Sequence, residues 1–107
     1  MGGRETTMFQ ARRQDDVIII RCEGELTREE LVEIAAAARK ARAEGCLVVV
    51  DLKRVTHLHY AGAALLRAIP GLRAAGANRY VRDLVFAGGA AGYVELYGDV
   101  EEAVRAA

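Results

Sequence analysis

The chain has 107 residues, of which 52% are hydrophobic and 28% are charged, and its 15 basic residues balance its 15 acidic ones. These values are typical of one soluble globular domain, and the balanced charge argues against a nucleic-acid-binding protein, which normally carries a basic excess. No apolar run approaches the roughly 20 residues that span a bilayer. We therefore expect one domain over residues 1–107, with residues 1–5 disordered. We also expect a cytoplasmic location, because the N-terminus has no apolar signal peptide.

The first part of the sequence predicts a β-hairpin. Residues 6–12 alternate loosely, as an edge strand does, and residues 14–16 favour a turn. Residues 17–22 are strongly β-forming and predict the second strand. Residues 23–26 include a glycine between two glutamates, and we expect them to break this strand.

A capping box predicts the start of the first helix, with Thr27 at the N-cap and Glu30 three residues later. We expect this helix to continue to about Ala43 and to end at Gly45. Its predicted buried face consists of apolar side chains at helical spacing: Leu31, Ile34, Ala35 and Ala38.

An unbroken run of apolar, mostly β-branched residues predicts a central strand over residues 46–51, covered on both faces. We expect Asp51 to end this strand, a short turn to follow, and a second helix to occupy residues 61–75. Pro70 disfavours helical geometry at Ile69 and predicts a kink or an early end there. The predicted apolar stripe of this helix is Leu65, Leu66, Ile69 and Leu72.

The last part of the sequence is less regular. Residues 84–87 predict a strand, and residues 90–98 fit either a strand or a short helix. Alternation over residues 93–97 favours a strand, but a parallel strand directly after another would need a crossover of about a dozen residues. We therefore favour the helix. Asp99 is expected to cap a terminal helix that has acidic residues in its first turn.

The two cysteines, Cys22 and Cys46, both fall in predicted strands. In a reducing compartment we expect them to be buried thiols that pack as small hydrophobic side chains. A disulfide between them on neighbouring strands is the less favoured alternative.

Three short motifs follow one another along the chain: Gly24-Glu25-Leu26, then Asp51-Leu52, then Gly62 at the start of a predicted helix. Together they resemble the STAS domain, a family named for sulfate transporters and anti-sigma-factor antagonists. The resemblance covers roughly residues 7–107. It implies an α/β sandwich in which helices pack on a small mixed β-sheet of four or five strands.

The usual turn of that family is Asp-Ser-Ser-Gly, and its second serine is the regulatory phosphorylation site. The corresponding residues here are His59, Tyr60, Ala61 and Gly62, so only the glycine is shared. The phosphorylation position therefore falls on Ala61 and is degenerate, because alanine has no hydroxyl. Tyr60 and Thr56 are the nearby hydroxyl-bearing substitutes.

The resemblance implies a non-catalytic interaction module that binds a protein partner through the turn and helix after the central strand. The implied partner-binding residues are Thr56, His57, His59, Tyr60, Ala61, Gly62 and Leu65. One implied function is that of a bacterial anti-sigma-factor antagonist, which regulates transcription by binding an anti-sigma factor or serine-kinase-like regulator. The alternative is a small cytoplasmic STAS subunit that binds the ATPase of an ABC-type lipid transport system. Both are compatible with a homodimer, and neither involves nucleic acid or membrane insertion.

An enzyme or small-ligand binder is the third interpretation and has the least support. The sequence has no Gly-x-Gly-x-x-Gly after a strand, no phosphate-loop lysine motif, no Cys-x-x-Cys and no His-Glu-x-x-His. His57 and His59 are the only histidines, and two ligands are too few for a zinc site. Asp51 has no catalytic companion at a motif spacing, and Gly88-Gly89 favours a flexible turn. We therefore expect no catalytic residue, metal or cofactor.

Overall fold

The computed structural model describes residues 9–89 and 93–106, so the expectation for residues 1–5 lies outside the described residues. The elements follow one another in the order β1 (Phe9–Gln14), β2 (Val17–Leu26), α1 (Arg28–Ala43), β3 (Leu47–Leu58), α2 (Tyr60–Ala63), the 3-10 helix η1 (Ala64–Ala68), β4 (Arg73–Ala75), α3 (Arg79–Ala87), β5 (Glu95–Tyr97) and α4 (Val100–Arg105).

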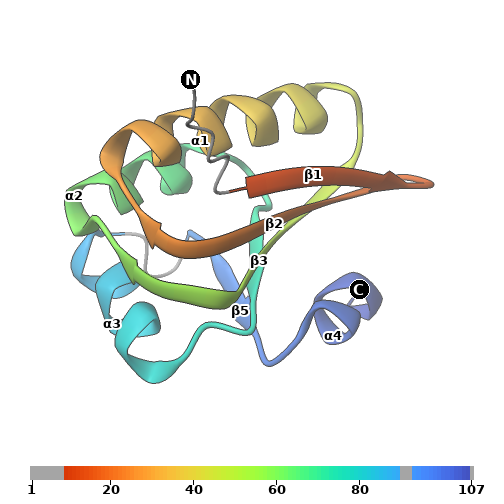
Figure 1. Cartoon of the computed structure of the whole chain (residues 1–107). Helices are drawn as coiled ribbons and strands as arrows, with labels where there is room; N and C mark the ends of the chain where they lie inside the picture. Colours follow the sequence, from red (N-terminus) through yellow and green to blue (C-terminus); the bar gives the residue numbers. More distant parts are fainter. Residues whose placement is uncertain (1–8, 90–92, 107) are drawn as a thin grey trace, which may run out of the picture.

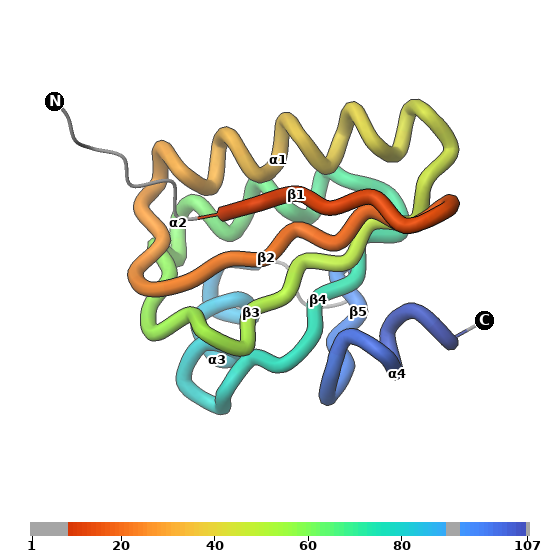
Figure 2. Tube along the Cα trace, turned by 45° about the vertical axis from the view of Figure 1, so that its right-hand side comes forward, coloured from red at the N-terminus to blue at the C-terminus, as the bar shows by residue number. Residues whose placement is uncertain are grey.

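Within the described residues, the strands form one mixed sheet in the order β1-β2-β3-β4-β5 (Figure 2). β1 pairs with β2 antiparallel, whereas β2 to β5 are parallel to one another. The hairpin turns at Asp15, whose φ of 56° is a left-handed conformation that aspartate tolerates. The predicted hairpin and the predicted small mixed sheet are therefore confirmed.

Helices cover both faces of the sheet (Figure 1), and the alternation of side chains along β3 explains this arrangement. Val48 and Val50 lie in the main core, which includes side chains of α1, α2, η1 and α3. Val49, between them, packs instead with Ala75 and with Ala103 of α4 on the opposite face. The result is the predicted α/β sandwich. In the described part of the chain, no helix combines the length and apolar character that a bilayer crossing requires.

β2 and β3 are longer than predicted, and the predicted strand ends at Cys22 and Asp51 are wrong. Their parallel pairing continues as far as Leu26 and Leu58. The pairing shifts register twice close to Gly24, whose φ is 77°. Such a β-bulge bends a strand without ending it, so the stretch that was expected to break β2 lies inside it.

The predicted second helix is shorter than residues 61–75. Helical structure ends at Ala68, just before Ile69 and Pro70, and this confirms the predicted early end. Arg73–Ala75 forms β4, a parallel neighbour of β3, so this part of the helix prediction is wrong. A strand of three residues is too short for its alternation to be distinguished from a helical pattern.

Residues 84–87, predicted as a strand, are the last part of α3. Asn78 caps this helix, because its side-chain oxygen accepts a hydrogen bond from the N–H of Val81 at 2.8 Å. α3 supplies the crossover that a parallel strand requires. The described part of residues 90–98 accordingly contains β5, and the favoured helix there is wrong. Residues 90–92 lie outside the described residues.

The predicted helix caps are confirmed. Thr27 Oγ1 accepts a hydrogen bond from the N–H of Glu30 at 3.2 Å, and Glu30 Oε1 accepts one from the N–H of Thr27 at 2.9 Å. The helix that they begin ends at Ala43. Asp99 caps α4, since its Oδ1 accepts a hydrogen bond from the N–H of Glu102 at 2.8 Å.

Arg73 of β4 binds the C-terminal end of α4 to the sheet. Its Nη1 donates hydrogen bonds to the carbonyl oxygens of Ala103 and Ala106, at 2.7 Å each. Its Nε lies 3.3 Å from Glu95 Oε1, and its guanidinium lies over the ring of Tyr97, 5.6 Å from the centroid. A cation at the C-terminal end of a helix also interacts favourably with the helix dipole.

Both cysteines are free and buried, as expected. Burial raises the pKa of the Cys22 thiol to about 12, and the nearby charges of Asp51 and Glu30 act in the same direction. Because the thiolate is the reactive form of cysteine, Cys22 is an inert core side chain.

Candidate partner-binding surface

The junction between β3 and α2 exposes the side chains that the sequence predicted to bind a partner. β3 ends at Leu58, which is fully buried, and His59 is the N-cap of α2. The Nδ1 atom of His59 accepts a hydrogen bond from the N–H of Gly62 at 3.2 Å. The histidine thus occupies the capping position that the oxygen of a serine or aspartate takes in other helices.

The side chains at this junction differ in exposure. Thr56, His59, Tyr60 and Ala61 are exposed, with Tyr60 at 59%. His57 and Leu65 are partly buried. The structure thus brings six of the seven predicted residues to the surface at least in part, along the end of β3 and the start of the following helix.

Gly62 is the exception, because it is buried. A Cβ atom at this position would lie only 2.7 Å from Cδ1 of Leu31. Gly62 therefore allows α2 to pack closely on α1. It is buried rather than exposed, and its role in partner binding stays a prediction.

Tyr80 is a further residue of this surface that the sequence analysis missed. His57 Nδ1 and the hydroxyl of Tyr80 are 2.7 Å apart and form a hydrogen bond, and their ring centroids are 5.7 Å apart. Tyr80 is in the first turn of α3, a helix that was not predicted from the sequence. An N-cap at Asn78, followed by apolar residues at helical spacing, was the signal that could have found it.

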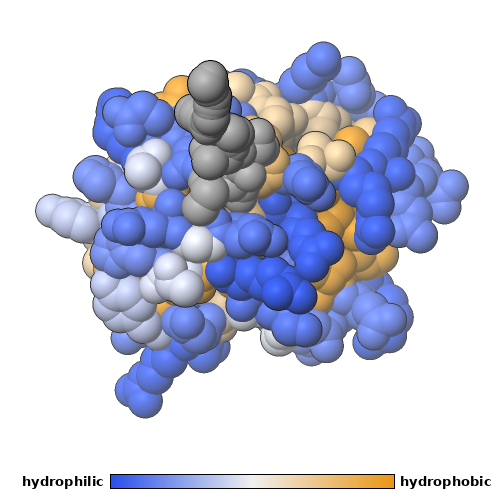
Figure 3. Space-filling model, viewed as in Figure 1, coloured by the Kyte–Doolittle hydropathy of each residue, from blue (hydrophilic) through white to orange (hydrophobic). Residues whose placement is uncertain are grey.

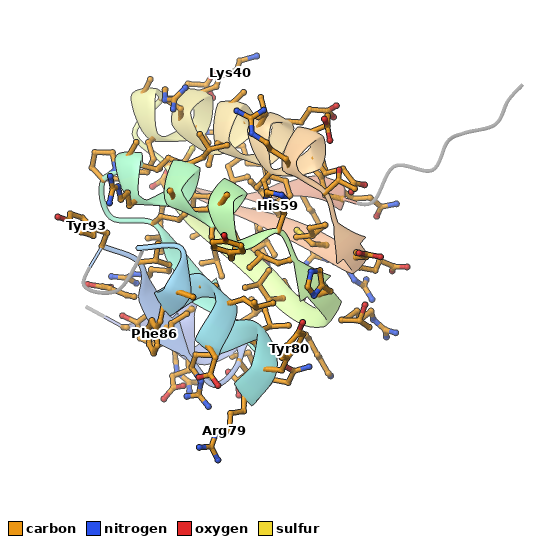
Figure 4. All side chains as sticks on the ribbon, turned by 90° about the vertical axis from the view of Figure 1, so that its left-hand side faces the viewer. Lys40, His59, Arg79, Tyr80, Phe86 and Tyr93 are labelled. Carbon is orange, nitrogen blue, oxygen red and sulfur yellow. The ribbon has the colours of Figure 1, made fainter. Side chains whose placement is uncertain are left out.

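Exposed aromatic residues gather on the side of the molecule formed by α2, α3 and the turn after α3 (Figure 4). We call Tyr60, Tyr80, Phe86 and Tyr93 the aromatic surface; the last three are 53%, 46% and 58% exposed. Arg67 of η1 lies over the ring of Tyr93, 5.9 Å from its centroid. Tyrosine is enriched at the energetically important positions of protein interfaces.

α2 and α3 are in close contact, which joins the predicted residues to this aromatic surface. A Cβ at Gly88, just after α3, would overlap the carbonyl oxygen of Tyr60 and lie 2.7 Å from Cβ of Ala63. The absence of a side chain at Gly88 thus permits the end of α3 to approach the start of α2.

No family model and no curated protein matches the sequence. Solved structures do match. The anti-sigma factor antagonist SpoIIAA, in its unphosphorylated form, has a TM-score of 0.67 at 19% sequence identity, over 90% of this chain and 92% of SpoIIAA. An anti-sigma factor antagonist from Mycobacterium paratuberculosis has a TM-score of 0.72 at 19% identity, over 90% of this chain and 89% of that one. The Thermotoga maritima protein TM1081 has a TM-score of 0.71 at 17% identity, over 91% and 92% of the two chains.

The chain has the STAS fold. The sequence resemblance to the STAS domain is thereby confirmed at the level of the fold. Residue 61 is the position at which that resemblance expects the phosphorylated serine, and here it is an exposed alanine in the first turn of α2. That Ala61 is a degenerate phosphorylation position stays a prediction.

Within this STAS fold, the two histidines do not converge on one point. His57 is directed to Tyr80 and His59 to the backbone of Gly62. The part of the chain that the structure describes contains no group of three or more His, Cys, Asp or Glu side chains that could hold a metal ion. Asp51 Oδ1 accepts a hydrogen bond from the N–H of Lys53 at 3.0 Å, so this carboxylate has a structural contact within its own strand.

Proposed function

We propose that this chain is a non-catalytic protein-interaction module of the anti-sigma-factor antagonist type. It binds a cytoplasmic regulatory protein, an anti-sigma factor or a serine-kinase-like regulator, through the start of α2. The observation that carries the proposal is the exposure of Tyr60 beside Ala61, on the side where further aromatic residues are exposed. Its support from the comparisons is the fold shared with SpoIIAA and another anti-sigma factor antagonist.

Because of Ala61, the proposed module binds its partner constitutively, without control by phosphorylation at this position. SpoIIAA has been solved in an unphosphorylated and a phosphorylated form, but the methyl side chain of Ala61 has no nucleophilic atom that could accept a phosphoryl group. The module therefore binds its partner without this form of control, unless exposed Tyr60 or Thr56 takes the place of the serine. A phosphoryl group there would add about two negative charges to the binding surface.

The test is a pull-down from the source cell with the wild-type protein, the Ala61→Glu variant and the Ala36→Glu variant as bait. Ala36 is an exposed alanine of α1, so the control carries the same added charge on a different helix. We expect the regulator to be captured by the wild type and by Ala36→Glu. Capture by Ala61→Glu should fall about tenfold or more, because binding would bury an unpaired carboxylate.

The identity of the captured protein decides between the proposal and its alternative. A kinase-like anti-sigma factor lost from the Ala61→Glu sample supports the proposed function. An ABC ATPase with the same behaviour supports a STAS subunit of a lipid transport system instead. Equal recovery of every protein with all three baits contradicts binding at the start of α2. Circular dichroism of the baits checks that each variant is folded.

A further inference from the structure

A groove crosses the face of the sheet that carries α4, opposite to the face covered by α2. It consists of two cavities of about 220 and 480 Å³, and both are lined by Asp51 and Val100. We call these two adjacent hollows together the α4 groove. Figure 3, viewed as Figure 1, shows apolar surface next to hydrophilic side chains in this part of the molecule.

The α4 groove is long compared with the size of a metabolite. Its lining begins at Arg12 of β1, passes Arg21 of β2 and Asp51 of β3, and reaches Gly76 and Gly98, which follow β4 and β5. It therefore crosses β1, β2 and β3 and then passes the residues that directly follow β4 and β5. Four steps of about 4.8 Å between strands give a length of about 19 Å, which about six residues of an extended peptide span.

The β1 end of the groove is cationic. Arg12 lies opposite Ile19, and Arg21 is two residues further along β2, so the two arginines are diagonal neighbours on the same face of the sheet. Among residues 9–89 and 93–106, the one ion pair joins Arg73 and Glu95. Asp51 lies opposite Arg21, but its carboxylate accepts a hydrogen bond from the backbone of its own strand.

The α4 end of the groove is acidic. Asp99 and Glu101 line it at the start of α4, with Lys53 as the one basic side chain among the residues of that cavity. Between the two ends, the lining includes Ile19, which is 8% exposed, and Val100, which is partly buried. The groove is therefore positive at one end, negative at the other and partly apolar in between.

We propose that the α4 groove binds an extended segment of a partner protein, about six residues long. The segment places an acidic side chain near Arg12 and Arg21, apolar side chains near Ile19 and Val100, and a basic side chain near Asp99 and Glu101. Charge complementarity at the two ends and the length from β1 to the residues that follow β5 identify this occupant. The proposal is independent of partner binding at α2, because the two surfaces lie on opposite faces of the sheet.

The test uses fluorescein-labelled hexapeptides, with binding followed by fluorescence anisotropy. Two bipolar peptides carry Glu and Lys at opposite ends, in either order, around a Val-Thr-Val-Ser centre. Two uniform peptides carry Glu at both ends or Lys at both ends. We expect one bipolar peptide to bind more tightly than both uniform peptides, since each uniform peptide meets one end of like charge.

Arg12→Glu and Arg13→Glu form a matched pair of variants. They change the net charge equally, but Arg13 lies opposite Ile18 on the other face of the sheet. We expect Arg12→Glu to lower the affinity for the bipolar peptide about tenfold, which is the effect of losing one charge-assisted contact. Arg13→Glu should change this affinity by no more than about twofold. Arg12→Glu should also bind the peptide with two lysines more tightly than the wild type does.

Three results would overturn the proposal. The first is that neither bipolar peptide binds more tightly than both uniform peptides. The second is that the Arg12 and Arg13 variants change the affinity equally. The third is a dimer in sedimentation experiments with the wild type that becomes a monomer in the Arg12→Glu variant. The occupant of the groove would then be a second copy of the chain. Ala61→Glu should bind the peptide normally, so failure at the groove and failure at α2 can be distinguished.

Discussion

At the scale of single residues, Gly62 illustrates how closely α2 packs on α1. Leu31 is 1% exposed, and its Cδ1 would lie 2.7 Å from a Cβ at residue 62. We expect Gly62→Ala to lower the free energy of unfolding by about 1–3 kcal/mol, because overpacking a tight contact forces side chains from their preferred positions. Urea unfolding followed by circular dichroism measures this loss.

A double-mutant cycle checks that Leu31 is the cause. In a Leu31→Ala background, Gly62→Ala should cost much less, because the space next to residue 62 is then free. Strictly additive losses in the cycle would contradict the contact. A Gly62 variant could lose partner binding either because the packing of α2 on α1 is disturbed or because the binding surface is changed. Ala61 is exposed, so a substitution there tests the binding surface alone.

The Cys22 thiol makes stability depend on pH. Its pKa is raised from 9.0 to about 12 in the folded protein, chiefly by burial. Above pH 9 the unfolded chain loses this proton while the folded protein keeps it, so ionisation favours unfolding. The contribution is fully present below pH 9 and is lost as the pH rises toward 12.

We expect the urea midpoint of a Cys46→Ala variant, in which Cys22 is the one remaining thiol, to fall between pH 8.5 and 10.5. The midpoint of a variant with both cysteines replaced by alanine should fall less over the same range. Ellman's reagent should react with Cys22 only after urea is added. Rapid reaction in the absence of urea would show that the thiol is accessible and would contradict its burial.

At the scale of the elements, α4 depends on a side chain from another part of the chain. Arg73 of β4 donates to two carbonyl oxygens at the end of α4, and its side chain is only 13% exposed. Arg73→Leu keeps most of the apolar contact but leaves those carbonyls unpaired. We expect a loss of about 2–3 kcal/mol in the free energy of unfolding, with faster hydrogen exchange in residues 100–106.

Arg105→Leu is the control for this prediction, since Arg105 is an exposed arginine of the same helix. It should leave both the free energy of unfolding and the exchange of α4 nearly unchanged. Equal acceleration of exchange in the two variants would mean that Arg73 does not hold the helix. Hydrogen exchange followed by mass spectrometry is the suitable measurement, because it reports on α4 separately from the sheet.

The elements that the sequence predicted correctly are those with local signals. Thr27 and Glu30 mark the start of α1 because both partners of the capping box are within one turn. Asp99 likewise marks the start of α4. The ends of β2 and β3 were missed because each strand is continued by its pairing with the other, and no local pattern contains that information.

The candidate site was predictable to the same extent. The residues at the start of α2 were predicted from the resemblance to the STAS domain, which implies binding through the turn and helix after the central strand. Tyr80, Phe86 and Tyr93 join them only because α3 packs against α2 and contacts β3, and this depends on Gly88 and on the hydrogen bond between His57 and Tyr80. Both are contacts between residues more than 20 positions apart, so they could not be read from local spacing.

At the scale of the whole molecule, the sheet separates two surfaces of different character. The face with α1, α2 and α3 carries the exposed aromatic side chains, whereas the face with α4 carries the bipolar groove. Formal charge is balanced over the whole chain. The charge of the groove therefore comes from the uneven local distribution of basic and acidic side chains. The two proposed binding sites therefore lie on opposite faces of the sheet, where an occupant of one would not block the other.

The order of the strands in the sheet, β1 to β5, is also their order along the chain. During synthesis each new strand can therefore pair with the strand made just before it, and no strand has to wait for a distant one. Such sequential pairing keeps loop-closure costs small at every step. α4 follows all five strands along the chain, so its face of the sheet is covered after they have paired, and Arg73 is already in place to bind it.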